Sequence, residues 1–249
     1  MKKDMKEVKL FRRLRGLLYV PRCGACGIRL DPDGGALCPS CHAAYEVQAT
    51  NRCAYCGEAF SECLCTNAAL SRAGIREVIK LFEYRRGEGD LPANRLLFLL
   101  KHRAPRLVVD FFAEALAERL DTLLPEDRTP YLVTWAPRSQ KARRRYGFDH
   151  MELVARAVGE RLSLPVAPLL VRTEGKEQKN QSGRAARFSN MKDAYAALSL
   201  TEEMRGREIL LLDDITTSGA TLTAAIRALR RSGIKKCRVA VLGCTLLRK

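Results

Sequence analysis

The chain has 249 residues, of which 47% are hydrophobic, so it is long enough to form an α/β domain with a real core and a smaller second unit. No stretch approaches the roughly 18 uninterrupted apolar residues that a membrane helix needs, which excludes a membrane span. The formal net charge of +16 favours anionic ligands such as phosphates or nucleic acid.

Residues 1–20 form a basic N-terminal segment, MKKDMKEVKLFRRLRGLLYV. Arginines interrupt it where a secretory signal peptide needs an unbroken apolar core, so we expect no export and a cytoplasmic protein. Ten cysteines in a chain without an export signal argue against a disulfide framework.

Eight of these cysteines lie between residues 23 and 65 and form two groups of four. A Cys-x2-Cys turn brings two thiolates onto one edge of a tetrahedron, and a second turn completes a soft ligand set that suits zinc. We predict a double zinc ribbon over residues 21–67, with two structural zinc ions that supply folding energy and with His42 as an alternative ligand. A c-type haem at CPSCH (38–42) would require export. The predicted ligands are Cys23, Cys26, Cys38 and Cys41, and Cys53, Cys56, Cys63 and Cys65.

Residues 68–249 have the composition of an α/β domain. The pattern predicts two helices within 94–124 divided by Pro105, a strand at 131–137, a helix at 148–162 and a long mobile loop at 172–193. A strand at 208–212, a helix at 220–232 ending at Gly233 and a strand at 237–242 follow. Alternating strands and helices indicate a mostly parallel sheet flanked by helices, with ligands beyond the carboxyl ends of the strands.

The stretch ILLLDDITTSGATL (209–222) places two carboxylates at such an end. Adjacent acids at the end of a buried strand are costly unless polar groups meet them, and sugar hydroxyls with a magnesium ion would do so. The hydroxyl-rich loop that follows offers free amides at the positive end of a helix, which is typical of a phosphate site. Together they predict a ribose 5-phosphate site. The loop lacks the lysine and glycine spacing of a Walker loop and the Gly-x-Gly of a dinucleotide fingerprint.

The run ILLLDDITTSGAT resembles the signature of type I phosphoribosyltransferases, which bind phosphoribosyl pyrophosphate (PRPP) with Mg²⁺. The resemblance implies that Asp213 and Asp214 hold the ribose hydroxyls and take part in catalysis. It implies that the 5-phosphate is wrapped by Thr216, Thr217, Ser218, Gly219, Ala220 and Thr221. Ser218 stands where a second threonine is usual and keeps the hydroxyl.

Further segments are similar to those of the ComF family, whose gluconate-linked branch is called GntX. They are the eight-cysteine module, LLKH (99–102), KARRRYGFDH (141–150) and QSGRAARFSN (181–190); Tyr146 departs from the family's arginine. In such a transferase a nucleophile attacks the anomeric carbon as pyrophosphate leaves, so the site needs cations and a lid rather than a covalent nucleophile. We expect Arg138, Lys141, Arg144 and Lys101 on the pyrophosphate side, and Arg184 and Arg187 as catalytic groups of the mobile loop. His150 is expected to cap or pack a helix.

The sequence therefore predicts a PRPP-binding, phosphoribosyltransferase-like protein of unknown acceptor, linked to DNA uptake in competence or to nucleotide salvage. The alternative is a single-stranded DNA-binding competence protein that uses this fold for regulation, or for binding without turnover. A third possibility is that the ribbon merely docks a protein partner, and competence-machinery proteins are possible partners. We expect residues 68–125 and parts of the C-terminus to form the acceptor pocket.

Overall fold

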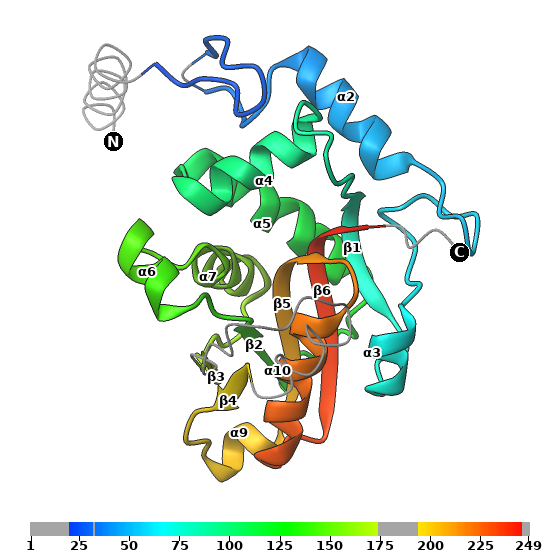
Figure 1. Ribbon diagram of the computed structural model, residues 1–249, viewed down its shortest axis with the longest axis vertical. Helices are drawn as coiled ribbons and strands as arrows, with labels where there is room; N and C mark the ends of the chain where they lie inside the picture. The colour runs from blue at the N-terminus through cyan, green and yellow to red at the C-terminus, as the bar shows by residue number, and fades with distance from the viewer. Residues whose placement is uncertain (1–19, 32, 174–193, 246–249) are drawn as a thin grey trace, which may run out of the picture.

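The computed structural model describes residues 20–31, 33–173 and 194–245 (Figure 1). Within them, no helix is both long enough and apolar enough to cross a bilayer. The N-terminal half contains α2 (Pro39–Thr50), α3 (Ala68–Arg72), β1 (Val78–Glu83), α4 (Pro92–His102) and α5 (Arg106–Asp121). The C-terminal half contains β2 (Tyr131–Trp135), α6 (Gln140–Tyr146), α7 (His150–Leu162), β3 (Leu170–Arg172), β4 (Tyr195–Ala197), α9 (Glu202–Gly206), β5 (Glu208–Thr216), α10 (Ala220–Arg231) and β6 (Lys236–Cys244).

Four strands form the central sheet in the order β1-β6-β5-β2, and every pairing is parallel. Parallel strands are buried on both faces, so each should be apolar throughout, as ILLL in β5 is. All carboxyl ends of the sheet lie at one edge, where α10 begins directly after β5 (Figure 1).

Helices cover both faces of this sheet and form two apolar layers. On one face α4, α5 and α7 pack against alternate residues of the strands, including Leu210 and Leu212 of β5. On the other face α10 and α3 pack against the intervening residues, including Ile209 and Leu211. The period of two along a strand sends neighbouring side chains to opposite faces, so a single apolar run supplies both layers.

The cysteine module packs onto the helical face instead of standing apart from it. Cys23, Tyr45 and other module residues belong to the same buried cluster as α4 and α5. The Gln48 side chain accepts a hydrogen bond from the Ala93 amide at 3.0 Å, and Arg95 donates to the Ala25 carbonyl at 2.7 Å. The module therefore gains stability from a shared core in addition to any metal.

The structure confirms the fold class, a parallel α/β sheet flanked by helices behind a small cysteine module, and it corrects several element bounds. Two helices do flank Pro105. β5 runs four residues further than predicted, through both aspartates to Thr216, because β6 extends far enough to pair with it. Arg172, expected as the first residue of the loop at 172–193, instead pairs with Tyr195 in the β3-β4 hairpin, and residues 174–193 of that expected loop lie outside the described residues. β1 was missed, because the buried Lys80 interrupts its apolar run.

Candidate functional site

The eight predicted cysteine ligands converge in the two predicted groups. In each group the four sulfur atoms all lie within 4.8 Å of one another. The Cys26 and Cys38 sulfurs are 3.7 Å apart, and the Cys38 amide lies 3.4 Å from the Cys23 sulfur. Four thiols at these separations fit a tetrahedral zinc ion, so both groups could bind zinc. His42 is in neither group.

The first turn of each group repeats the same backbone design. Gly27 and Gly57 have φ values of +74° and +79°, which favour glycine, and each donates its amide to the carbonyl four residues earlier at 2.9 Å. Arg22 donates to the Gly27 carbonyl at 3.0 Å, and Arg52 donates to the Gly57 carbonyl at 2.8 Å. The first turns of the two cysteine groups therefore have the same backbone structure, and in the sequence only the cysteine spacing indicated this similarity.

Backbone amides around these turns favour thiolate. Burial opposes ionisation of Cys23 and Cys53, but hydrogen bonds from neighbouring amides outweigh it and lower the pKa of the two thiols to about 6 and about 7. Because a thiolate is the zinc-binding form, Cys23 and Cys53 favour metal binding at neutral pH, whereas burial and the neighbouring thiols raise the pKa of Cys41 and Cys65 to about 12.

The two predicted carboxylates lie at the carboxyl end of β5. Asp213 is 7% exposed, and its Oδ1 accepts the Asp214 amide at 2.9 Å. Burial and then the neighbouring Asp214 charge raise the pKa of Asp213 well above its usual range. A buried carboxyl of this kind is stabilised most by a ligand that donates hydroxyl hydrogen bonds to it or places a cation beside it.

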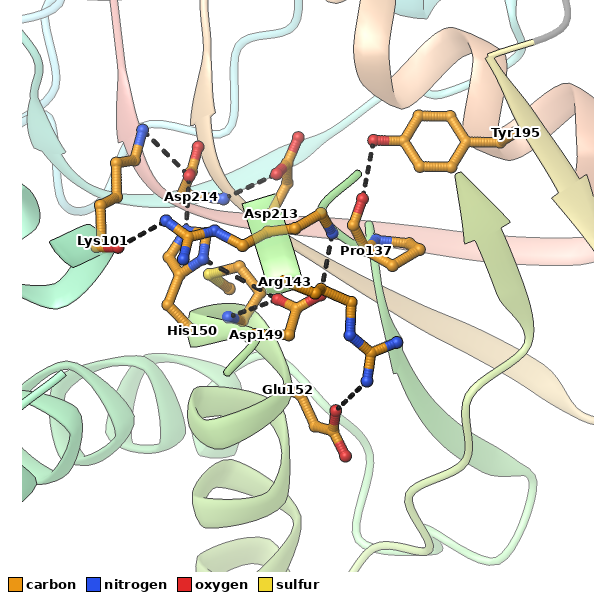
Figure 2. A network of polar contacts seen from close by, with 11 residues as sticks. Lys101, Pro137, Arg143, Asp149, His150, Glu152, Tyr195, Asp213 and Asp214 are labelled. Atoms are coloured by element: carbon orange, nitrogen blue, oxygen red, sulfur yellow. Dashed lines mark hydrogen bonds and ion pairs between the residues drawn. The ribbon is translucent and has the colours of Figure 1, made fainter. Parts of the chain in front are cut away.

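Two side chains from distant elements hold Asp214 (Figure 2). Lys101, in the last turn of α4, places Nζ 3.0 Å from Oδ2, and His150, the first residue of α7, places Nε2 2.7 Å from the same oxygen. Burial would raise the pKa of Asp214, but the contacts with His150 and Lys101 outweigh it and lower that pKa below its ordinary value. The pair of acids is therefore split into one ionised carboxylate and one that resists ionisation.

Asp149 fixes the position of His150 and of the loop after β2. It caps α7 by accepting the Met151 amide at 3.2 Å, and its other oxygen accepts the Arg138 amide at 2.8 Å. The Arg138 guanidinium donates to the Lys101 carbonyl at 2.5 Å. One network thus joins the ends of β2, α4, α7 and β5, as Figure 2 shows.

The predicted phosphate loop is short and opens onto α10. Thr217 and Ser218 are exposed, and Gly219, with φ +77°, is the N-cap residue of α10. No side chain caps this helix, whereas Asp149 caps α7 and Ser139 caps α6. A twelve-residue helix with uncapped first-turn amides attracts an anion through its dipole and its N–H groups.

Asn67 lies against this loop and was not anticipated. Its Oδ1 caps α3 by accepting the Ala69 and Leu70 amides, and its Nδ2 donates to the Thr217 carbonyl at 3.4 Å. A Cβ added to Gly219 would meet the Asn67 side chain at 2.7 Å. Because Asn67 follows Cys65 by two residues, the second cysteine group is connected directly to the phosphate loop.

The structure brings some of the predicted cations to the acids and leaves others apart. Lys101 and Arg138 belong to the network. Lys141 and Arg144 are exposed on α6, and no described contact links them to the acids. Arg184 and Arg187 lie outside the described residues, but β3 and β4 bring the two ends of their segment together. Nearby, the Tyr195 hydroxyl donates to the Pro137 carbonyl at 3.4 Å.

Residues 152–243 match the family model of the phosphoribosyl transferase domain. A search of curated proteins gave no match. One similar solved structure is an allosteric regulatory enzyme of purine biosynthesis, with 16% sequence identity and a TM-score of 0.37. The match covers 58% of this chain and 30% of the enzyme's chain. A purine phosphoribosyltransferase from Pyrococcus horikoshii has 16% identity, coverage of 56% and 77%, and a TM-score of 0.33. A Neisseria gonorrhoeae protein with bound ppGpp has 15% identity, coverage of 57% and 70%, and a TM-score of 0.36.

The family match runs from α7 to β6 and so contains both carboxylates and the whole phosphate loop. Residues 152–243 are therefore similar to a phosphoribosyl transferase domain, and they follow two cysteine groups that could bind zinc.

Proposed function

We propose that this protein binds PRPP with Mg²⁺ at the end of β5 and transfers its phosphoribosyl group to an acceptor. The observation that carries the proposal is the direct succession of two buried-strand carboxylates and an uncapped helix N-terminus. Asp213 and Asp214 accept the ribose hydroxyls, and residues 216–221 bind the 5-phosphate. We further propose that residues 21–67 form a double zinc ribbon, that residues 68–249 form the transferase domain, and that the protein is cytoplasmic.

The chain's own groups fit the transfer step. Carboxylate oxygens are ligands that Mg²⁺ prefers, so Asp213 and Asp214 would hold the ion, which supplies positive charge to the departing pyrophosphate. Lys101, whose side chain is 30% exposed, contacts Asp214, and Arg138 contacts Lys101, which supports our proposal that both stabilise the departing pyrophosphate. His150 keeps Asp214 ionised and oriented, while Arg184 and Arg187 are proposed to close over the leaving group.

Isothermal titration with Mg–PRPP tests this proposal. The wild-type protein should bind, and Asp213→Asn/Asp214→Asn should abolish the signal. Asp90→Asn/Glu202→Gln is a matched control, because these side chains are 96% and 88% exposed and the variant also removes two negative charges. Absence of binding to the wild type, or equal binding by the double variant, would contradict the proposal.

A second candidate function, binding of single-stranded DNA, is favoured by a partly exposed patch of aromatic and basic side chains. Phe98 is 64% exposed and stacks on His102 with ring centroids 4.0 Å apart, and Tyr146 meets His102 edge-on at 5.3 Å. The guanidinium groups of Arg138 and Arg145 lie 4.7 and 5.3 Å from the Tyr146 ring. Aromatic side chains beside arginines form a stacking platform for bases. This candidate fits the competence role implied by the ComF resemblance, as would docking of a competence protein on the ribbon.

Fluorescence anisotropy with a labelled oligothymidine tests the patch. Binding should weaken steeply as salt rises, and Phe98→Ala should cost about 1–3 kcal/mol, the usual contribution of one stacked base. Val47→Ala removes an equally exposed apolar side chain (62%) from α2 and should leave affinity unchanged. Salt-independent binding, or equal losses in both variants, would exclude this surface.

A further inference from the structure

The second cysteine group continues along the chain into a side chain that touches the phosphate loop. Two residues after its last cysteine, Cys65, comes Asn67, the N-cap residue of α3. Asn67 uses both ends of its amide. Its Oδ1 accepts two amides from the first turn of α3 at 3.1 and 3.0 Å, and its Nδ2 donates to the Thr217 carbonyl at 3.4 Å. One side chain therefore joins the cysteine module, α3 and the phosphate loop.

The phosphate loop is packed closely against this side chain. A Cβ added to Gly219, the N-cap residue of α10, would lie 2.7 Å from Asn67 and 3.0 Å from Leu70 of α3. On its other side the loop is held by the Thr245 amide, which donates to the Thr216 carbonyl at 3.0 Å. Because closely packed groups transmit strain, a shift of Asn67 and α3 would displace the first-turn amides of α10, which are the proposed phosphate donors.

The cysteines just before Asn67 are held in a way that suits a bound metal. The Cys65 amide lies 3.4 Å from the Cys63 sulfur, and Lys80 of β1 places Nζ 2.9 Å from the Cys65 carbonyl. Lys80 is only 2% exposed, and its other hydrogen bond, to the Val78 carbonyl, is also to a neutral group. A zinc ion with four thiolates carries a net charge of −2, so the loaded group would offset this buried ammonium.

The first cysteine group has no such route to the phosphate loop. Its contacts lead to α4, where Arg95 donates to the Ala25 carbonyl at 2.7 Å and a Cβ added to Gly24 would meet Leu96 at 2.5 Å. In the described ranges, no backbone hydrogen bond joins this group to residues 216–221. The two groups share the same turn structure, so the first is an internal control for the second.

We propose that Asn67 is a positioning residue through which metal binding at the second cysteine group sets the affinity of the phosphate loop. The inference rests on the proposed function, since it takes residues 216–221 as the phosphate site. A bound metal fixes residues 63–65, so that Asn67 holds the Thr217 carbonyl and the amides of α10 are pre-organised. Thermodynamic linkage makes the effect reciprocal, so PRPP should raise the zinc affinity of the second group by the same factor.

The first test replaces Asn67 in the full-length, zinc-loaded protein. Asn67→Ser keeps an oxygen that can cap α3 but has no amide to donate to Thr217. Its affinity for Mg–PRPP in calorimetry should fall about three- to tenfold, the usual effect of one hydrogen bond, while its urea midpoint and zinc content stay unchanged. Asn51→Ser is the matched control, because it removes an amide that donates to Glu83 instead. Equal affinity of Asn67→Ser and the wild type would overturn the inference.

The second test removes one thiolate from either group. Cys63→Ser should weaken Mg–PRPP binding more than Cys26→Ser, and should alone speed hydrogen exchange at residues 216–223. In Cys26→Ser, which keeps the second group intact, saturating Mg–PRPP should raise the zinc affinity measured by chelator competition. Adding Asn67→Ser should reduce that effect. Equal changes in the two cysteine variants, or no effect of PRPP on zinc, would overturn the coupling.

These readouts separate the two proposals. If the wild type binds PRPP and Asn67→Ser or Cys63→Ser binds it equally well, the coupling is refuted and the proposed function survives. If the wild type does not bind PRPP, the proposed function fails, and hydrogen exchange decides the coupling by itself. If Cys63→Ser does not fold, Asn67→Ser, which keeps all eight cysteines of the module, decides it.

Discussion

Replacing Gly219 by alanine should damage the phosphate loop in two separable ways. The residue has φ +77°, and a left-handed backbone costs a non-glycine residue roughly 1–2 kcal/mol. The new Cβ would also lie 2.7 Å from the Asn67 side chain and 3.0 Å from the fully buried Leu70, and such overpacking typically costs about 1–3 kcal/mol. We therefore expect a loss of about 2–5 kcal/mol in the free energy of unfolding.

Two further variants isolate the contact. Gly87→Ala imposes the same kind of backbone strain at φ +90° with no atom within 4 Å of the new Cβ, so it should lose only about 1–2 kcal/mol. Asn67→Ala removes the clashing group and the cap of α3, at about 1 kcal/mol. The double variant Gly219→Ala/Asn67→Ala should lose less stability than the sum of the losses in the two single variants, because both changes affect the same contact.

Urea unfolding measures these differences in stability, and titration with Mg–PRPP measures how well the phosphate loop still binds its ligand. A shift of the first-turn amides of α10 should weaken PRPP binding at least tenfold, which corresponds to about 1.4 kcal/mol. Gly87→Ala should bind normally. If Gly219→Ala is no less stable than Gly87→Ala and binds PRPP equally well, the close approach of Asn67 has no energetic meaning and this reasoning is wrong.

Three other predictions concern charge and metal. Lys101→Met should lower the free energy of unfolding by about 2 kcal/mol near neutral pH, a value between those for exposed and buried ion pairs. Because the contacts of Asp214 lower its pKa, the difference between variant and wild type in urea unfolding should vanish as acid protonates Asp214. Since the pKa of Asp213 is raised, Mg–PRPP affinity should increase with pH until Asp213 ionises, and a calorimetric pH series on Asp213→Asn should lack this rise. The wild type should contain about two zinc ions per chain, measured with a chromogenic chelator after release by a thiol reagent. The count should fall to about one in Cys63→Ser. Cys237 lies outside both groups, so Cys237→Ser should match the wild type.

Local sequence was sufficient wherever the functional atoms are neighbours along the chain. Asp213, Asp214 and Gly219 lie in one strand–turn–helix unit, so their relation follows from the backbone geometry of that unit. The cysteine turns are equally local, because two residues between cysteines bring their sulfurs together. Pro105 divides two helices since its ring cannot fit inside either one.

The tertiary structure decided which distant groups meet these local units. His150 and Asp214 are 64 residues apart in sequence, and Asn67 and Thr217 are 150 apart. Their contacts depend on the strand order β1-β6-β5-β2, which brings the ends of β2 and α4 to the acids and the second cysteine group to the phosphate loop. A repeating pattern of side chains fixes which face of an element is buried, but not which element covers it; only the packing of the whole chain settles that.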